Sequence, residues 1–143
     1  MTDYTREIRN GHADGLWLKC FSNGNIEYFG RFSKGDVVGA DFAFYEGGAI
    51  LRIGFANGPI IDFDEKGEVS QKRWIVQGKN VSETEYALAA EHDSSMPPYY
   101  SDATQYKRFL SKDFMVFWQK YHEMAPVKIP LEFDESGNPV LAK

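Results

Sequence analysis

Apolar residues in the first half of the chain recur at even spacings between glycine-containing turns. Two sets show this spacing: Ile26, Tyr28 and Phe32, and Phe42, Phe44 and Ile50. Because successive side chains of a β-strand point to opposite faces, the spacing predicts that each set lies on one strand face. The pattern indicates an antiparallel meander of about seven or eight short strands.

The glycines between these apolar positions are periodic. Segments 15–26 and 39–50, offset by 24 residues, share a glycine, an aromatic residue six positions on, a second glycine three later and then Ile. Segment 61–69 is a shortened third copy. A second element, in which an apolar residue precedes a glycine by three positions, occurs four times, at 8–11, 32–35, 55–58 and 75–78. We therefore expect each repeat to form two short strands joined by tight hairpin turns.

These motifs, Gly-x-x-x-x-x-Phe/Tyr-x-x-Gly-x-Ile and Phe-x-x-Gly-x-x-x-Gly, span segment 8–78. They resemble the MORN-repeat variant of bacterial YwqK-type antitoxin proteins. The resemblance implies a curved, open, single-layer sheet of stacked hairpins, each touching only its neighbours. The third copy departs from the pattern, because Gly58 is followed by Pro59 and has no second glycine four residues on.

The second half of the chain predicts helices that cover this sheet. Ser82 and Glu85 form a capping-box pattern before a helix of about ten residues that ends near His92. Segment 93–101 contains two prolines and is expected to be a loop. From Asp102 apolar residues recur at helical spacing and predict a long helix packed on the sheet, either continuous or broken at Ser111. The residues of this stripe are Tyr106, Leu110, Phe114, Phe117, Tyr121 and Met124, broadened by Phe109, Met115 and Trp118.

The expected fold class is thus α+β, mainly β, in one domain over residues 1–143. Residues 1–80 form the repeat sheet, 81–125 the helical segment and 126–143 a tail. In the tail, Phe133–Gly137 echoes Phe63–Gly67. Two interpretations stay open: a strand and turn of the repeat type, or a common way of closing a strand.

Composition agrees with this fold class and argues against two kinds of function, nucleic-acid binding and insertion into a membrane. Aromatic residues make up 15% of the chain and glycine occurs 13 times, as short strands with tight turns require. The formal charge of −5 argues against a nucleic-acid binder. No apolar run reaches the roughly 18–20 residues of a membrane-spanning helix, so no stable membrane insertion is expected. The polar N-terminus has no signal-peptide core, and the single Cys20 cannot form an internal disulfide, so a cytoplasmic location is expected.

The chain shows no catalytic or metal-binding constellation. His12, His92 and His122 lack partners at ligand spacing, and Pro126 occupies the place where a zinc helix motif would need its second histidine. Cys20 has no neighbouring base and is interpreted as a packed thiol. We therefore expect no metal, no cofactor and no enzymatic activity.

Negative charge is concentrated in the repeats. Residues 36–70 contain seven acidic and two basic residues. On stacked strands several of these carboxylates should lie near one another on one sheet face or edge, where a basic partner protein would relieve their repulsion. The alternative is that they keep the sheet soluble and guard its edges. The seven acidic residues are Asp36, Asp41, Glu46, Asp62, Asp64, Glu65 and Glu68.

Two tyrosines complete the candidate binding residues. Tyr99 and Tyr100 lie on the Pro-containing loop, where they suit a protein interface or could tuck under the following helix. With the resemblance, these features predict a non-catalytic immunity protein or antitoxin that neutralises a toxin through an acidic surface. The alternative is a MORN-repeat scaffold or targeting module that binds another protein or, against its charge, a lipid surface.

Overall fold

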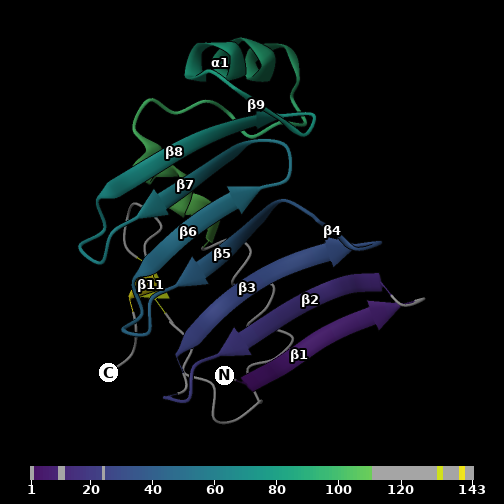
Figure 1. Ribbon diagram of the computed structural model, residues 1–143, viewed down its shortest axis with the longest axis vertical. Helices are drawn as coiled ribbons and strands as arrows, with labels where there is room; N and C mark the ends of the chain where they lie inside the picture. The colour runs from purple at the N-terminus through teal and green to yellow at the C-terminus, as the bar shows by residue number, and fades with distance from the viewer. Residues whose placement is uncertain (1, 10–11, 24, 111–131, 134–138, 141–143) are drawn as a thin grey trace.

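The fold is built on one nine-stranded antiparallel sheet with helices on one side (Figure 1). The computed structural model describes residues 2–9, 12–23, 25–110, 132–133 and 139–140, with backbone alone at 2–16, 18, 20 and the two C-terminal strands. The nine strands are β1 (Thr2–Arg9), β2 (His12–Cys20), β3 (Ile26–Ser33), β4 (Asp36–Val37), β5 (Ala40–Phe44), β6 (Ile50–Phe55), β7 (Pro59–Phe63), β8 (Val69–Val76) and β9 (Lys79–Val81).

Strand order confirms the predicted meander. The order is β1-β2-β3-β5-β6-β7-β8-β9, so, apart from the short β4, each strand pairs with the next one along the chain. Strand β4 pairs with β3 beside this path. Every pairing is antiparallel. Antiparallel neighbours need only short connections, which the periodic glycine-containing segments provide.

Three hairpins, β2–β3, β5–β6 and β7–β8, close in the same way. In each turn a backbone N–H donates to the carbonyl four residues further on, at 2.8 Å in all three. Gly48 and Gly67 take positive φ values of 108° and 89° in two of these turns, a conformation that glycine adopts without steric penalty. The donor and acceptor pairs are Phe21 and Asn25, Tyr45 and Ala49, and Asp64 and Glu68.

One extra residue follows each of these turns. The register shifts by one residue in the strand after the turn, which leaves Glu27, Leu51 and Ser70 without a direct partner. Such β-bulges turn the following side chain to the other sheet face. The prediction that Ile26 and Tyr28 share a face is therefore wrong: Ile26 is buried in the core, whereas Tyr28 pairs with Ala43 on the opposite face.

The second class of glycine turns is less uniform than the sequence predicts. Lys34 with Gly35, and Gln77 with Gly78, have positive φ at both positions, as in two-residue type I′ turns. Gly58 has no positive φ. A Cβ atom there would lie 2.9 Å from Cγ of Pro97, so this position needs glycine for close packing of the turn on the loop.

The first predicted helix is confirmed, and only residues 102–110 of the second predicted helix lie in the described part of the chain. Helix α1 (Glu83–His92) has the full capping box of Ser82 and Glu85. Asp102 caps the 3₁₀ helix η1 (Ala103–Lys107), and helical geometry continues through 108–110. Tyr106 and Leu110 are fully buried, as predicted. The expected helical residues from Phe114 to Met124, and the break at Ser111, lie outside the described residues.

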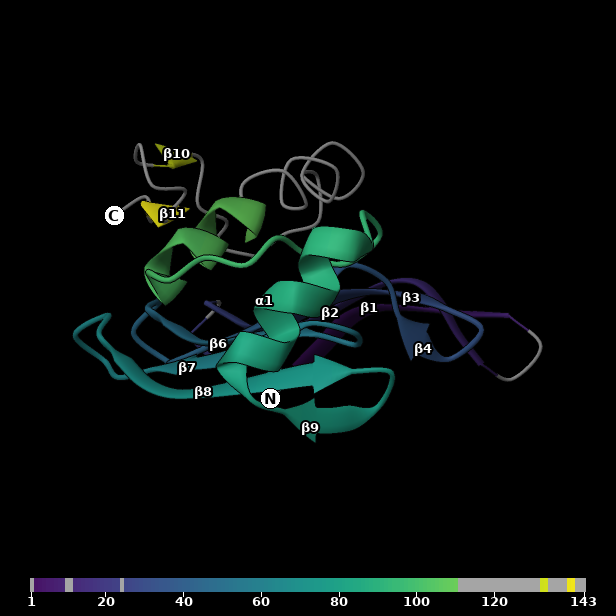
Figure 2. The ribbon, with the colours of Figure 1, turned by 90° about the horizontal axis from the view of Figure 1, so that it is seen from above.

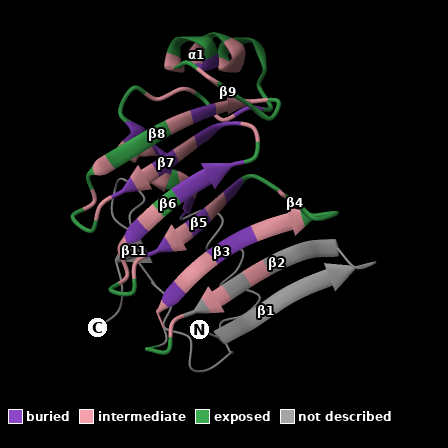
Figure 3. Cartoon of the chain, in the orientation of Figure 1, coloured by how far each residue is buried: buried purple, intermediate pink, exposed green. Residues whose placement is uncertain are grey.

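The core lies between the sheet and the layer formed by α1, the following loop and η1 (Figure 2). Buried residues gather on β3, β5, β6 and β7 (Figure 3). Trp74 of β8 joins the layers, because its ring centroid lies 5.1 Å from that of Tyr86 in α1 and 6.4 Å from that of Tyr106 in η1. Burial raises the pKa of Tyr86 to about 12, and its hydroxyl donates to the Pro97 carbonyl at 2.6 Å.

The tail contributes a second small sheet. Strands β10 (Glu132–Phe133) and β11 (Pro139–Val140) pair with each other in antiparallel fashion. Phe133 thus ends a strand, as Phe63 ends β7. Residues 134–138 lie outside the described part of the chain, so both interpretations of Phe133–Gly137 stay open.

Candidate functional site

One face of the sheet carries no described element. Phe42 and Ile53 pair with each other and are fully buried in the core. The side chains of their strand neighbours Asp41 and Arg52 therefore point to the opposite side. Within the described residues, α1, the loop and η1 all lie on the core side (Figure 2). We call the other side the open face.

A row of polar contacts crosses the open face. The hydroxyl of Tyr28 on β3 donates to Oδ2 of Asp41 on β5 at 2.8 Å. On the next two strands, Nε and Nη2 of Arg52 donate to the two carboxylate oxygens of Asp62 at 2.5 and 3.2 Å. The positive charge of Arg52 also acts on Asp41, so the four side chains form one electrostatic row across β3, β5, β6 and β7.

Two glycines make room for this row. A Cβ at Gly30 would lie 2.7 Å from the Tyr28 hydroxyl, and a Cβ at Gly54 would lie 2.7 Å from Oδ1 of Asp41. These glycines are offset by 24 residues, the repeat distance. Larger residues at either position would displace the phenol or the carboxylate from the sheet surface.

Burial and the contacts within the row shift the pKa values of Tyr28, Asp41 and Arg52. Burial raises the pKa of the Tyr28 phenol, as does the negative charge of Asp41, so the phenol stays protonated and donates. Burial also raises the pKa of Asp41, while the Tyr28 hydrogen bond and the charge of Arg52 oppose that shift. The hydrogen bond to Asp62 raises the pKa of Arg52. Within the row, the Tyr28 phenol therefore donates to Asp41, and the charged Arg52 pairs with Asp62.

The seven predicted acidic residues fall into three places. Asp41 and Asp62 lie in the row on the open face, and Asp36 is the first residue of β4, at the far end of the strands. The other four lie in or next to the β5–β6 and β7–β8 turns, which we call the acidic edge: Glu46, Asp64, Glu65 and Glu68. The sequence had grouped all seven by their proximity along the chain.

The turns of this edge are joined to one another. Both Asn23 and Asn25 donate through their side-chain amides to the carbonyl of Glu46, at 3.2 and 2.8 Å. The Tyr45 hydroxyl donates to the Phe63 carbonyl at 2.7 Å. These contacts hold the three equivalent turns side by side at one end of the strands.

Asp64 has a structural role in the acidic edge. Its carboxylate accepts hydrogen bonds from the backbone N–H groups of Lys66 and Glu68, at 2.9 and 3.0 Å. Glu46, Glu65 and Glu68 are exposed. The exposed three are therefore the carboxylates of this edge that a partner could reach.

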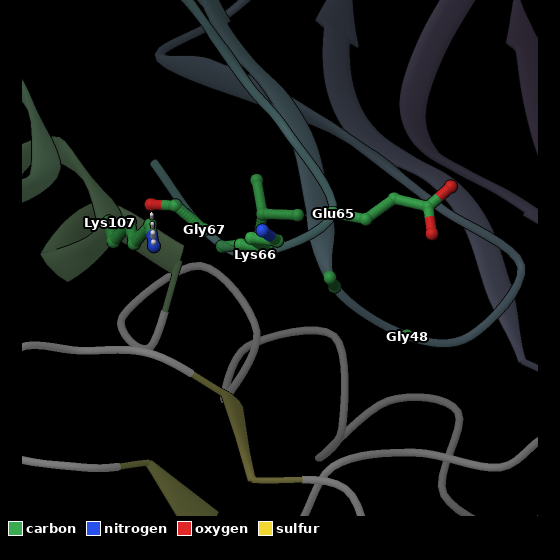
Figure 4. A pocket seen from close by; sticks show the side chains of 7 residues that line it. Gly48, Glu65, Lys66, Gly67 and Lys107 are labelled. Carbon is green, nitrogen blue, oxygen red and sulfur yellow. Dashed lines mark hydrogen bonds between the residues drawn. The ribbon is translucent and has the colours of Figure 1, made fainter. Parts of the chain in front are cut away.

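A small hollow of about 190 Å³ lies between two of these turns and η1 (Figure 4). Lys107 of η1 reaches the Gly67 carbonyl at 3.4 Å, while the Glu65 carboxylate points away from Lys107. The Lys107 ammonium also lies 4.7 Å from the centre of the Phe63 ring. This lysine therefore ties η1 to the turn.

Tyr99 and Tyr100 are half-buried and pack against the core. The Tyr99 hydroxyl donates to Glu83 at 2.5 Å, and its ring lies 5.6 Å from that of Trp74. The ring of Tyr100 lies 4.8 Å from that of Tyr106. The hydrogen bond to Tyr99 lowers the pKa of Glu83. Tyr100 thus packs on the segment that follows it, as in the alternative prediction, whereas the contacts of Tyr99 are with α1 and β8.

Sequence reasoning missed a second feature of the open face. Trp17 and Phe32 face the same side as Tyr28, and their ring centroids are 5.1 Å apart. A signal was present, because the 24-residue offset aligns Trp17 with the polar Asp41 rather than with the apolar core positions beside it. Trp17 could thus have been placed on the outer face.

Comparisons with known proteins leave the family open. Neither a protein-family model nor a curated protein nor a solved structure matches the chain. Within the described residues, no three His, Cys, Asp or Glu side chains are placed to hold a metal ion. None of the described helices combines the length and apolar character needed to cross a membrane.

Proposed function

We propose that this protein is a non-catalytic binding protein, an immunity protein or antitoxin that neutralises a cognate bacterial toxin by direct one-to-one binding. The observation that carries the proposal is the open face. Described elements cover one side of the sheet, whereas the other side presents Trp17, Phe32 and a row of polar side chains. A surface with aromatic anchors and oriented charges suits protein recognition.

The acidic edge supports a basic partner. Glu46, Glu65 and Glu68 are exposed on adjoining turns at one end of the sheet, and the chain carries a net charge of −5. Complementary charge speeds encounter and aligns partners. A toxin that acts on nucleic acid would present a basic cleft that fits this edge.

The resemblance to YwqK-type antitoxin proteins points in the same direction. It rests on the glycine and aromatic spacing of segment 8–78. The three equivalent turns, each followed by one bulged residue, are what a repeated hairpin unit would produce. We infer from this agreement that the repeats form one binding scaffold.

The direct test pairs the chain with the product of an adjoining toxin gene. We expect the two proteins to co-purify as a 1:1 complex by size-exclusion chromatography with light scattering. We also expect stoichiometric addition of this chain to abolish toxin activity. Absence of both a complex and protection would refute the proposal.

Charge variants locate the surface. Replacing Glu46 and Glu65 together by Gln should slow association and reduce its dependence on salt, because edge charges act mainly on encounter. Asp36→Asn is the matched control, since Asp36 is exposed at the opposite end of the strands. Equal effects of the two changes would contradict a role for the acidic edge.

A further inference from the structure

A hollow on the open face lies beside the row of polar contacts and shares one residue, Tyr28, with it. Its volume is about 300 Å³. This volume is at the lower end of the roughly 300–1,000 Å³ typical of small-molecule sites, so it suits a single side chain. The lining residues come from β2, β3 and β5: Trp17, Lys19, Glu27, Tyr28, Phe32 and Ala43.

Aromatic rings form much of its wall. The rings of Trp17 and Phe32 are 5.1 Å apart and inclined by 43°, and the Tyr28 ring lines the same hollow. The faces of aromatic rings attract cations, tryptophan most strongly. The wall therefore favours a cationic or planar group over a purely aliphatic one.

Glu27 supplies the negative charge. It is the bulged residue of β3, and the bulge brings it to the hollow beside Tyr28. Its Oε2 atom is buried and has no hydrogen-bond partner among the described residues. Because a buried acceptor without a donor is costly, a donor that enters the hollow would stabilise the site. Rotation about the terminal bond of the side chain lets either oxygen meet it.

Lys19 is the opposing charge in the lining. Within the described residues it forms no ion pair with Glu27. A lysine ammonium on its flexible four-carbon stem can move into solvent when another cation enters. Removing its charge should strengthen the binding of a cation in the hollow and weaken the binding of an anion, so a substitution of Lys19 distinguishes the two kinds of site.

We propose that this hollow receives an arginine side chain of a protein partner, which stacks on Trp17 and donates to Glu27. Arginine fits better than lysine because its planar guanidinium both stacks on rings and offers several donors in one plane. The inference rests on the proposed function, since a basic partner is what would supply the arginine.

The first test uses the isolated, ¹⁵N-labelled protein and a model of the side chain. Titration with N-acetyl-arginine amide should give saturable NMR shifts at the backbone amides of Trp17, Glu27 and Tyr28. N-acetyl-citrulline amide, which has the same shape without the charge, and N-acetyl-glutamate amide should not. Equal shifts with citrulline, or shifts spread over other strands, would overturn the proposal.

Two variants in the hollow and one control variant sharpen the test. Glu27→Gln should weaken binding of N-acetyl-arginine amide by about tenfold, the effect of losing one charge-assisted hydrogen bond. Glu46→Gln, the same change on the acidic edge, should leave the affinity unchanged. Lys19→Met should strengthen binding of the arginine probe, and this variant decides alone if Glu27→Gln does not fold. Weaker binding after Lys19→Met would contradict the proposal.

The complex with a toxin separates this inference from the proposed function. If the toxin binds and Glu27→Gln leaves its affinity unchanged, the arginine site is wrong and the proposed function stands. If the arginine probe binds in the hollow and the toxin does not bind, the site stands and the proposed function is wrong.

Discussion

Tyr28 shows how one inserted residue changes the chemistry of a sheet face. The bulge at Glu27 turns the phenol away from the core and onto the open face, where it donates to Asp41. Even spacing along the sequence could not reveal this, because a bulge leaves no mark on the apolar pattern. Phe42, Phe44 and Ile50 are all buried in the core, as their apolar spacing suggested, although Ile50 begins β6 and does not share one strand with the other two.

The Tyr28–Asp41 contact is expected to stabilise the fold. Tyr28→Phe removes the donor from a half-buried carboxylate, so we expect a loss of about 1–3 kcal/mol in the free energy of unfolding. The measurement is urea denaturation of Tyr28→Phe, Asp41→Asn and the double variant. A coupling energy near zero in this cycle would show that the two side chains act independently.

The raised pKa of Asp41 predicts a pH dependence of stability. Its folded-state pKa lies above the ordinary value of 3.8, so between those two values the folded state holds more protons than the unfolded state. Stability should therefore fall as pH rises through this window. Asp41→Asn should remove this part of the pH profile in urea unfolding measured from pH 3 to 7. An unchanged difference between the two proteins across that range would contradict the prediction.

At the scale of elements, glycine spacing predicted where the strands end, but it did not show why each turn needs a glycine. Gly48, Gly67, Gly35 and Gly78 have the positive φ that tight turns require. Gly58 shares the sequence motif of Gly35 and Gly78 but is needed for contact with Pro97, a residue 39 positions further on. Local motifs cannot show such long-range packing, whereas the capping box of α1 is local and was predicted in full.

A pair of glycine substitutions tests this distinction. Gly58→Ala should lower the free energy of unfolding by about 1–3 kcal/mol, because the new methyl group overlaps with Pro97 and Phe55. Gly47→Ala should change it by less than about 1 kcal/mol, since no atom lies within 4 Å of the added Cβ. Thermal or urea unfolding of both variants is the measurement. Equal destabilisation by both would refute the packing role.

At the scale of the whole molecule, the meander and its helical cover were predictable, and the distribution of charge over the surface was not. Adjacent hairpins follow from local turn signals, so strand order could be derived from the chain. Which carboxylates share a surface depends on bulges and on which end of the sheet each turn occupies. Asp36 and Glu46 are ten residues apart in sequence, yet they lie at opposite ends of the strands.

The Tyr106 hydroxyl joins two parts of the cover, the loop that follows α1 and the helix η1. It accepts from the backbone N–H of Tyr100 at 3.0 Å and donates to the Pro98 carbonyl at 2.7 Å. Tyr106→Phe leaves both groups without this partner, so we expect destabilisation of about 1–3 kcal/mol by thermal unfolding. Tyr100→Phe is the control, because the contacts of Tyr100 are made by its ring and backbone. A smaller effect at Tyr106 than at Tyr100 would contradict this role.

The order of sheet and cover along the chain has a consequence for synthesis on the ribosome. Strands β1 to β9 emerge before α1 and η1, and each strand can pair with the one made just before it. Contacts between near neighbours in sequence favour fast folding. The core face of Phe29, Phe42 and Ile53 nevertheless stays bare until residue 110 has emerged. The nascent chain therefore passes through a stage in which a formed sheet is open to chaperones and to aggregation.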